Sequence, residues 1–156
     1  TPDEWKPIPG SLEAIAHLTQ AGYRVVVATN QSGIGRGLLD MTAFNAINDK
    51  MCKAVNQEGG RIDAMFFCPH THADQCDCRK PATGMFEEIA QRFSLDLKGA
   101  PTIGDSLRDL QAAAAVGAAP ILVLTGKGKE TRAAGGLPGN TQIFADLAQA
   151  VDTLTG

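Results

Sequence analysis

Hydrophobic positions along the chain fall into two alternating patterns, helical spacing and short unbroken apolar runs. Residues 11–22 have the helical spacing, with Ser11 as the expected N-cap and Gly22 as the expected end of the helix. Residues 23–30 form the first segment of the second kind, which is rich in β-branched side chains and shows no polar alternation. A run of this kind predicts a strand that is buried on both faces.

The same alternation continues to the end of the chain. The predicted elements are a helix from Thr42 with Phe44, Ile47, Met51 and Val55 on one face, a strand at 63–68, a helix near 83–94, a strand at 100–105, a helix at 106–117, a strand at 120–124, a loop at 125–136, a short strand at 142–144 and a last helix capped by Asp146. Alternating strands and helices predict an α/β fold with a doubly wound, Rossmann-like parallel sheet. Such sheets bind ligands beyond the carboxyl ends of their strands, so candidate site residues are expected there.

Length and charge exclude several classes of partner. The chain has 156 residues, 44% of them apolar, and a net charge of −3. These values predict a single domain spanning residues 1–156. The negative charge argues against a nucleic-acid partner, which requires a basic face. The apolar runs are too short to cross a bilayer, so no membrane partner is expected.

Soft metal ligands are concentrated after the second predicted strand. Cys68, His70, Cys76 and Cys78 fall within eleven positions, in the pattern C-x-H-x5-C-x-C. Four thiolate and imidazole ligands are typical of a structural zinc site, which leaves no position open for water. His72 competes with His70 for the fourth ligand position, and a chance cluster of surface thiols is the simpler alternative.

The remaining cysteine and histidine outside this cluster carry no such signal. Cys52 lies within an apolar helical pattern and reads as a small core residue. His17 lies on the first predicted helix and reads as a surface residue. The cysteines therefore do not predict a disulfide framework, and their clustering favours metal binding in a reducing compartment.

Polar residues also follow the predicted strands. Thr29 and Asn30 end the first strand, where a hydroxyl and an amide can face an anion, although such residues are also common in turns. Arg79 and Lys80 follow the cysteine cluster directly. Both side chains bind phosphate in proteins, and both are as often plain solvated charges.

A carboxylate follows the third predicted strand. Asp105 is placed to hold Mg²⁺, which prefers oxygen ligands and bridges to substrate phosphates. Asp109 lies four positions further on, one helical turn away. The alternative reading is structural, because Asp is a favoured residue in the first turn of a helix.

Taken together and in order, the segments "ATNQSGIGRG", "CPHTHADQCDCRKP" and "IGDSLRDLQAA" resemble the haloacid dehalogenase-like phosphatases. The resemblance runs from about Pro9 to Leu154, and the cysteine loop followed by Arg-Lys-Pro places it in the zinc-loop branch without a large cap domain. This branch includes phosphatases of a heptose bisphosphate and of histidinol phosphate. The "QSGIGRG" continuation is more similar to the heptose enzymes, which implies removal of the 7-phosphate of the bisphosphate through an aspartyl-phosphate, in lipopolysaccharide precursor synthesis.

The resemblance implies a role for each candidate residue. The implied roles are binding of the transferring phosphoryl group (Thr29), lining of the substrate pocket (Asn30, Gln31, Ser32), recognition of the sugar phosphate (Arg79), neutralisation of the phosphoryl oxygens (Lys80), Mg²⁺ binding (Asp105) and structural Zn²⁺ binding (Cys68, His70, Cys76, Cys78). Ser106 stands where many relatives have Lys. The implied protein is a cytoplasmic monomer acting on a small phosphorylated sugar.

One part of the family pattern is missing. The nucleophile and the acid/base of these enzymes lie in a D-x-D motif on a first strand, and residues 1–156 contain no such motif. We therefore expect an N-terminally truncated chain that lacks its first strand and is inactive by itself. The alternative from a different functional class is a non-catalytic, zinc-stabilised module that binds a phosphorylated ligand.

Overall fold

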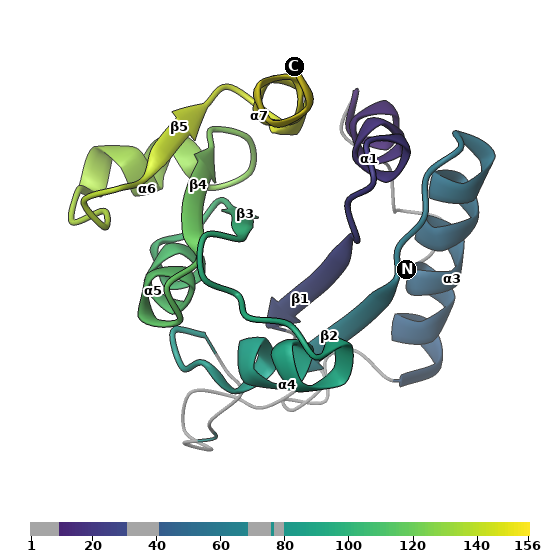
Figure 1. The fold of residues 1–156 in the computed structure, drawn as a ribbon, viewed down its shortest axis with the longest axis horizontal. Helices are drawn as coiled ribbons and strands as arrows, with labels where there is room; N and C mark the ends of the chain where they lie inside the picture. Colours follow the sequence, from purple (N-terminus) through teal and green to yellow (C-terminus); the bar gives the residue numbers. More distant parts are fainter. Residues whose placement is uncertain (1–9, 31–40, 69–75, 77–79) are drawn as a thin grey trace. The chain divides into compact units, whose positions relative to one another are not determined.

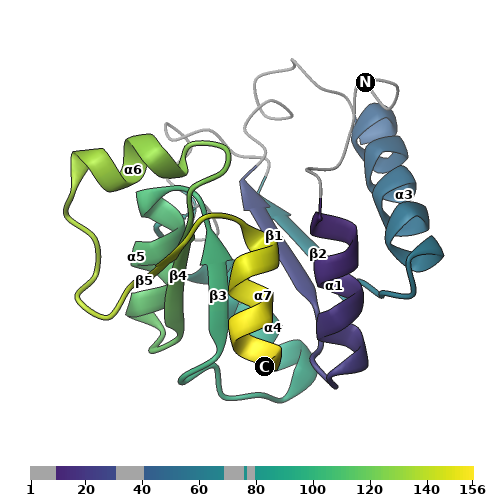
Figure 2. The ribbon, with the colours of Figure 1, turned by 90° about the horizontal axis from the view of Figure 1, so that it is seen from above.

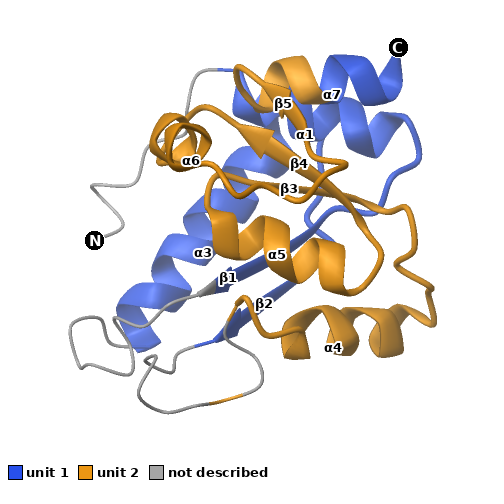
Figure 3. Ribbon diagram, turned by 90° about the vertical axis from the view of Figure 1, so that its left-hand side faces the viewer, with its two compact units in different colours: residues 1–74, 151–156 blue, residues 75–150 orange. Residues whose placement is uncertain are grey.

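The computed structural model of the protein describes residues 10–30, 41–68, 76 and 80–156. Contacts between residues divide the chain into two compact units, shown in different colours in Figure 3. Unit 1 comprises residues 1–74 and 151–156, and unit 2 comprises residues 75–150.

Helices and parallel strands alternate along the chain, as the hydrophobic pattern predicts (Figure 1). In order, the elements are α1 (Ser11–Gln20), β1 (Val26–Asn30), α3 (Met41–Gln57), β2 (Ala64–Cys68), α4 (Gly84–Phe93), β3 (Pro101–Gly104), α5 (Leu107–Ala115), β4 (Ala119–Val123), α6 (Gly128–Ala134), β5 (Gln142–Phe144) and α7 (Leu147–Thr155). The predicted α/β class with parallel strand pairing is confirmed. The described strands form two sheets, β1-β2 and β3-β4-β5.

In unit 1, β1 and β2 pair in parallel. The helix α3 carries Phe44 and Val55 on its buried face, as its spacing predicts. The ring of Phe44 lies 4.8 Å from the ring of Phe67 on β2, centroid to centroid. The aromatic contact therefore fixes α3 against the sheet of this unit.

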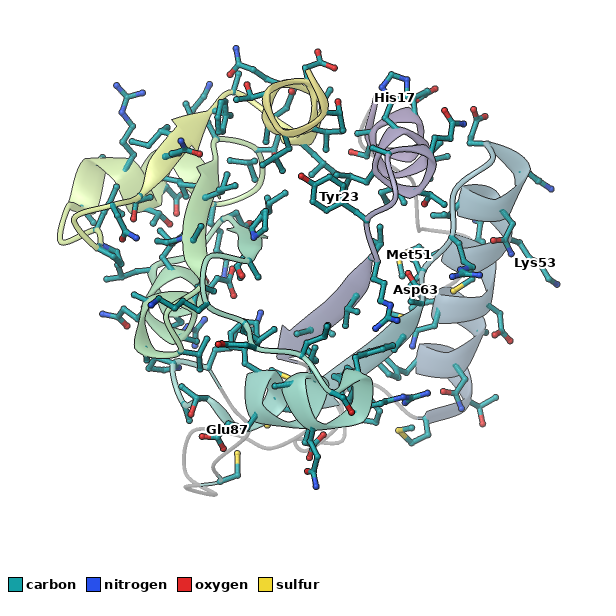
Figure 4. All side chains as sticks on the ribbon, viewed as in Figure 1. His17, Tyr23, Met51, Lys53, Asp63 and Glu87 are labelled. Atoms are coloured by element: carbon teal, nitrogen blue, oxygen red, sulfur yellow. The ribbon has the colours of Figure 1, made fainter. Side chains whose placement is uncertain are left out.

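The strand β1 begins at Val26, three residues later than the hydrophobic run predicts. Just before it, the Val25 N–H donates to the Asp63 carboxylate at 2.8 Å, and the Asp63 N–H donates to the Val25 carbonyl at 2.7 Å. Figure 4 labels Asp63 at this position. A side-chain acceptor thus replaces a ladder bond at the start of β1. Residues 26–29 are half-buried, so the prediction of burial on both faces is wrong.

The first helix differs from the prediction at its N-terminus and agrees with it at its C-terminus. Gly10, with φ of 87°, is the N-cap of α1, and no side chain caps the helix, so Ser11 is a helical residue. Gly22 adopts φ of 92° just after the helix ends, because glycine tolerates this left-handed conformation. His17 is exposed, as expected, and points away from α1 in Figure 4.

In unit 2, β3, β4 and β5 form a parallel sheet with β4 in the centre (Figure 2). The helix α5 packs against both β3 and β4. Leu110 of α5 and Ile121 and Leu122 of β4 are almost completely buried. Removing these apolar side chains from water is the main driving force for assembling this unit.

Residues 125–136 contain a helix, α6, where the sequence predicts only a loop. Within this helix, Lys129, Glu130 and Ala133 are good helix formers. The helix α6 and the turn before it contact Asp105.

The last helix is capped as predicted. The Asp146 side chain accepts from the Gln149 N–H at 2.8 Å, and the Gln149 side chain accepts from the Ala145 N–H at 2.7 Å. Across the described ranges, none of the helices combines the length and apolar character that crossing a membrane requires.

Candidate functional site

Asp105 follows directly after β3 and is held by the segment that precedes and begins α6. Its carboxylate oxygen Oδ2 accepts from the Lys127 N–H at 3.0 Å. Its backbone carbonyl accepts from the Thr131 hydroxyl at 2.7 Å. Within the described part of the chain, Oδ1 accepts no hydrogen bond. Asp105 therefore has one anchored oxygen and one that is open to a ligand.

Lys80 is buried and paired with a carboxylate of the same unit. Its side chain is the buried charged group of the described core, with 9% of its surface exposed. Its ammonium nitrogen lies 2.8 Å from Asp109 Oδ1. An ammonium group held in this way keeps its charge in a fixed place. Such a charge is suited to stabilising a phosphoryl group.

Asp109 connects Lys80 to the residue that follows Asp105. Its second oxygen, Oδ2, accepts from the Ser106 N–H at 3.3 Å, and the Ser106 hydroxyl accepts from the Asp109 N–H at 3.4 Å. This reciprocal pair is a capping box at the N-terminus of α5. The turn that carries Asp105 and the cation Lys80 are thereby tied to the same carboxylate.

Gly104 allows this turn to approach Asp109. A Cβ atom at position 104 would lie 2.5 Å from both Cβ and Oδ2 of Asp109. Atoms at this separation overlap, so the position admits only glycine without a shift of Asp109. The Gly-Asp pair of the sequence motif thus combines a close backbone approach with a carboxylate.

The other candidate substrate residues belong to unit 1 or lie outside the described residues. Thr29 is half-buried one residue before the end of β1, and Asn30 ends that strand opposite Cys68 of β2. Gln31 and Ser32 lie outside the described residues.

The structure describes two of the four predicted zinc ligands. Cys68 is buried at the end of β2, and Cys76 is half-buried. His70 and Cys78 lie outside the described residues, as does Arg79. No group of three or more metal-binding side chains occurs among the residues that are described. The zinc site therefore stays a prediction.

The burial of Cys52 and the partners of Asp105 both differ from what the sequence predicts. Cys52 is half-buried on α3, not fully buried as a core residue. The sequence predicts a loop over this segment and assigns no role to Lys127 and Thr131, which the structure shows as partners of Asp105. The signal available in the sequence was the pair of glycines, Gly126 and Gly128, on either side of Lys127. Paired glycines often mark a close approach of the backbone to another group.

The chain is similar to phosphatases over almost its whole length. D-glycero-beta-D-manno-heptose-1,7-bisphosphate 7-phosphatase from Bordetella bronchiseptica is 57% identical over 99% of this chain and 86% of its own length. The enzyme of the same name from Neisseria meningitidis is 54% identical over 93% of this chain and 79% of its own length. A family described as HAD-hydrolase-like matches residues 77–150, and one described as polynucleotide kinase 3 phosphatase matches residues 1–107.

The chain belongs to the haloacid dehalogenase-like hydrolases. Two solved structures of this haloacid dehalogenase-like family resemble it closely. D,D-heptose 1,7-bisphosphate phosphatase from B. bronchiseptica, complexed with magnesium and phosphate, has a TM-score of 0.97 and 57% identity over 99% of this chain and 86% of that one. The enzyme from Burkholderia thailandensis has a TM-score of 0.81 and 56% identity over 99% of this chain and 90% of that one.

Family membership bears on two expectations from the sequence. The hydrolase class is confirmed. The expectation that residues 1–156 are inactive by themselves is not supported, because the haloacid dehalogenase-like relative from B. bronchiseptica aligns over 99% of this chain.

Proposed function

We propose that the protein is a Mg²⁺-dependent phosphatase that removes the 7-phosphate of D-glycero-D-manno-heptose 1,7-bisphosphate in lipopolysaccharide precursor synthesis. The observation that carries the proposal is Asp105, a carboxylate with one open oxygen at the end of β3, in the turn that Asp109 links to the buried cation Lys80. The names of relatives at 57% and 54% identity support the choice of substrate. The proposal includes the cytoplasmic location and monomeric state expected from the sequence.

The chemistry of the described residues fits Mg²⁺. This ion binds proteins through one or two carboxylates and takes its other ligands from water and substrate phosphate. Oδ1 of Asp105 supplies one such oxygen, whereas both oxygens of Asp109 are occupied by Lys80 and Ser106. We therefore propose Asp105 as a Mg²⁺ ligand and Asp109 as a support for Lys80. When bound, Mg²⁺ supplies positive charge next to the phosphoryl oxygens.

The protein side chains are proposed to position the phosphoryl group and stabilise its charge, which is most of what phosphoryl transfer requires. Lys80 neutralises charge on the phosphoryl oxygens, and the Thr29 hydroxyl donates to them. Asn30, Gln31, Ser32 and Arg79 are proposed substrate contacts. The aspartyl-phosphate route also requires a nucleophilic carboxylate in a D-x-D motif, which residues 1–156 do not contain.

The experiment measures phosphate release from the heptose bisphosphate and from histidinol phosphate by the full-length protein. We expect Mg²⁺-dependent release from the heptose bisphosphate, and Asp105→Asn should lower kcat by ~10²-fold or more, as for the loss of one charge contact in the transition state. Asp152→Asn is the matched control, since Asp152 is exposed on α7. Faster release from histidinol phosphate would reassign the substrate. Release from neither would favour the non-catalytic alternative.

We also propose a structural zinc bound by Cys68, His70, Cys76 and Cys78. Its support is the ligand spacing, together with the placement of Cys68 at the end of β2. Zinc would order the loop that carries Arg79 and Lys80. Metal analysis should find one zinc per chain, lost in Cys76→Ser and retained in Cys52→Ser. Purified protein without zinc would refute this part of the proposal and leave the phosphatase proposal standing.

A further inference from the structure

Residues 125–131, here called the 125–131 segment, are folded around Asp105 by a closed set of hydrogen bonds. The Lys127 N–H donates to Asp105 Oδ2 at 3.0 Å, and the Thr131 hydroxyl donates to the Asp105 carbonyl at 2.7 Å. The Thr131 N–H donates to the Lys127 carbonyl at 2.9 Å, which closes the ring. The side chain and the backbone of Asp105 are therefore both fixed by residues more than twenty positions away along the chain.

The two glycines of the 125–131 segment permit this close approach. Gly126 has φ of 57°, and a Cβ atom there would overlap Oδ2 of Asp105. A Cβ atom on Gly128 would overlap the Val123 carbonyl oxygen at the end of β4. The backbone of the segment thus fills the space on one side of the Asp105 carboxylate.

Anchoring one oxygen of a carboxylate decides how it meets a metal ion. A carboxylate with two unoccupied oxygens binds either through one of them or through both, and it can rotate about χ2. In Asp105 the Lys127 N–H occupies Oδ2, which leaves Oδ1 as the available ligand atom. The Thr131 hydroxyl holds the backbone from which the side chain extends.

We propose that Thr131 and the backbone N–H of Lys127 are positioning groups that preset Asp105 to bind a divalent cation through Oδ1 alone. This inference rests on the proposed function, in which Asp105 is a Mg²⁺ ligand. Groups that do not touch the metal but hydrogen-bond to one of its ligands typically contribute about 10–100-fold to metal affinity. The sequence predicts only a loop for the 125–131 segment. In this proposal the segment positions the Asp105 carboxylate.

The first test replaces the Thr131 hydroxyl. Thr131→Val keeps the shape of the side chain and removes its hydrogen bond, and Thr131→Ser keeps the hydroxyl. Thr141→Val is the matched control, because the Thr141 hydroxyl is buried and makes no hydrogen bond in the described structure. Mn²⁺ binding, followed by the electron paramagnetic resonance signal of free Mn²⁺, should weaken ~10-fold in Thr131→Val and remain unchanged in Thr131→Ser and Thr141→Val.

The second test moves the carboxylate directly. Gly126→Ala places a methyl group against Oδ2 of Asp105, and we expect it to weaken Mn²⁺ binding by ~10–100-fold. Gly136→Ala is the control, since Gly136 also has positive φ, 76°, but no atom lies near its Cβ position. Both substitutions carry the same kind of backbone strain, so a difference between them isolates the contact with Asp105.

Comparing Mn²⁺ binding by the wild-type protein and by Asp105→Asn tests the metal role of Asp105 separately from the positioning role of Thr131 and Lys127. If both bind Mn²⁺ equally well, Asp105 is not a metal ligand, and the metal role and the inference are both overturned. If Asp105→Asn weakens binding but Thr131→Val matches Thr141→Val, the inference alone is overturned. Far-UV circular dichroism monitors folding, and the glycine pair decides the outcome if Thr131→Val does not fold.

Discussion

Asp109 uses its two carboxylate oxygens for two different partners. Oδ1 accepts from the Lys80 ammonium group, and Oδ2 accepts from the Ser106 N–H. Both charges of the Lys80–Asp109 pair are largely shielded from water. Burying two charges is costly, and removing one of them leaves the other unpaired, which costs more than the pair contributes. The pair therefore holds Lys80 in place rather than simply adding stability.

Asp109→Asn should lower the free energy of unfolding by about 3 kcal/mol, because the buried Lys80 charge would lose the Asp109 carboxylate that lies 2.8 Å away. Arg61→Ala is the control, since Arg61 pairs with Asp63 while its side chain is 71% exposed. Exposed pairs contribute ~0–1 kcal/mol, so this change should be nearly neutral. Urea unfolding followed by circular dichroism compares the two, and equal losses would contradict a special role of the buried pair.

At the scale of elements, the helices differ in how the first backbone N–H groups at their N-termini are hydrogen-bonded. A capping box between Ser106 and Asp109 caps the N-terminus of α5, and the Asp146 side chain caps the N-terminus of α7. The helix α1 begins after Gly10 with no side-chain cap. Because the first N–H groups of a helix lack partners within it, these caps contribute unequally to the stability of the three helices.

Ser106→Ala should cost about 1 kcal/mol of stability, since it removes the hydroxyl that accepts from the Asp109 N–H. Ser11→Ala should change stability by less than ~0.5 kcal/mol, because Ser11 is the first residue inside α1 and its side chain caps nothing. Thermal unfolding of the two variants measures the difference. A larger loss for Ser11→Ala would place the cap of α1 at Ser11, where the sequence suggests it.

At the scale of the whole molecule, each compact unit has buried apolar residues of its own. Val55 is buried in unit 1, and Leu110, Ile121 and Leu122 are buried in unit 2. In unit 2, these side chains come from α5 and β4, the helix and the central strand of its sheet. The same helix begins with the turn that carries Asp109, so the core of this unit also supports the candidate site.

Leu110→Ala should lower the free energy of unfolding by roughly 3 kcal/mol, through the lost burial and the cavity that remains. Leu95→Ala deletes the same atoms from a side chain that is 44% exposed, and should cost less than about 1 kcal/mol. Chemical unfolding gives both values. Similar losses in the two variants would mean that Leu110 does not anchor the core of unit 2.

The sequence by itself determined the order and type of most elements, together with the Gly22 end of α1 and the Asp146 cap of α7. It also placed Thr29 and Asp105 at strand ends. These features depend on residues within a few positions of one another, so periodicity and turn chemistry report them. The helix α6 was the exception, since the sequence predicts a loop over residues 125–136.

Only the tertiary structure decided which side chains meet. Val25 and Asp63, Lys80 and Asp109, and Asp105 and Thr131 are separated by 38, 29 and 26 positions. Propensity and periodicity act over a helical turn or a strand, whereas these pairings arise when packing brings distant segments together. The sequence thus predicted a ligand role for Asp105, and the folded chain revealed how its carboxylate is held.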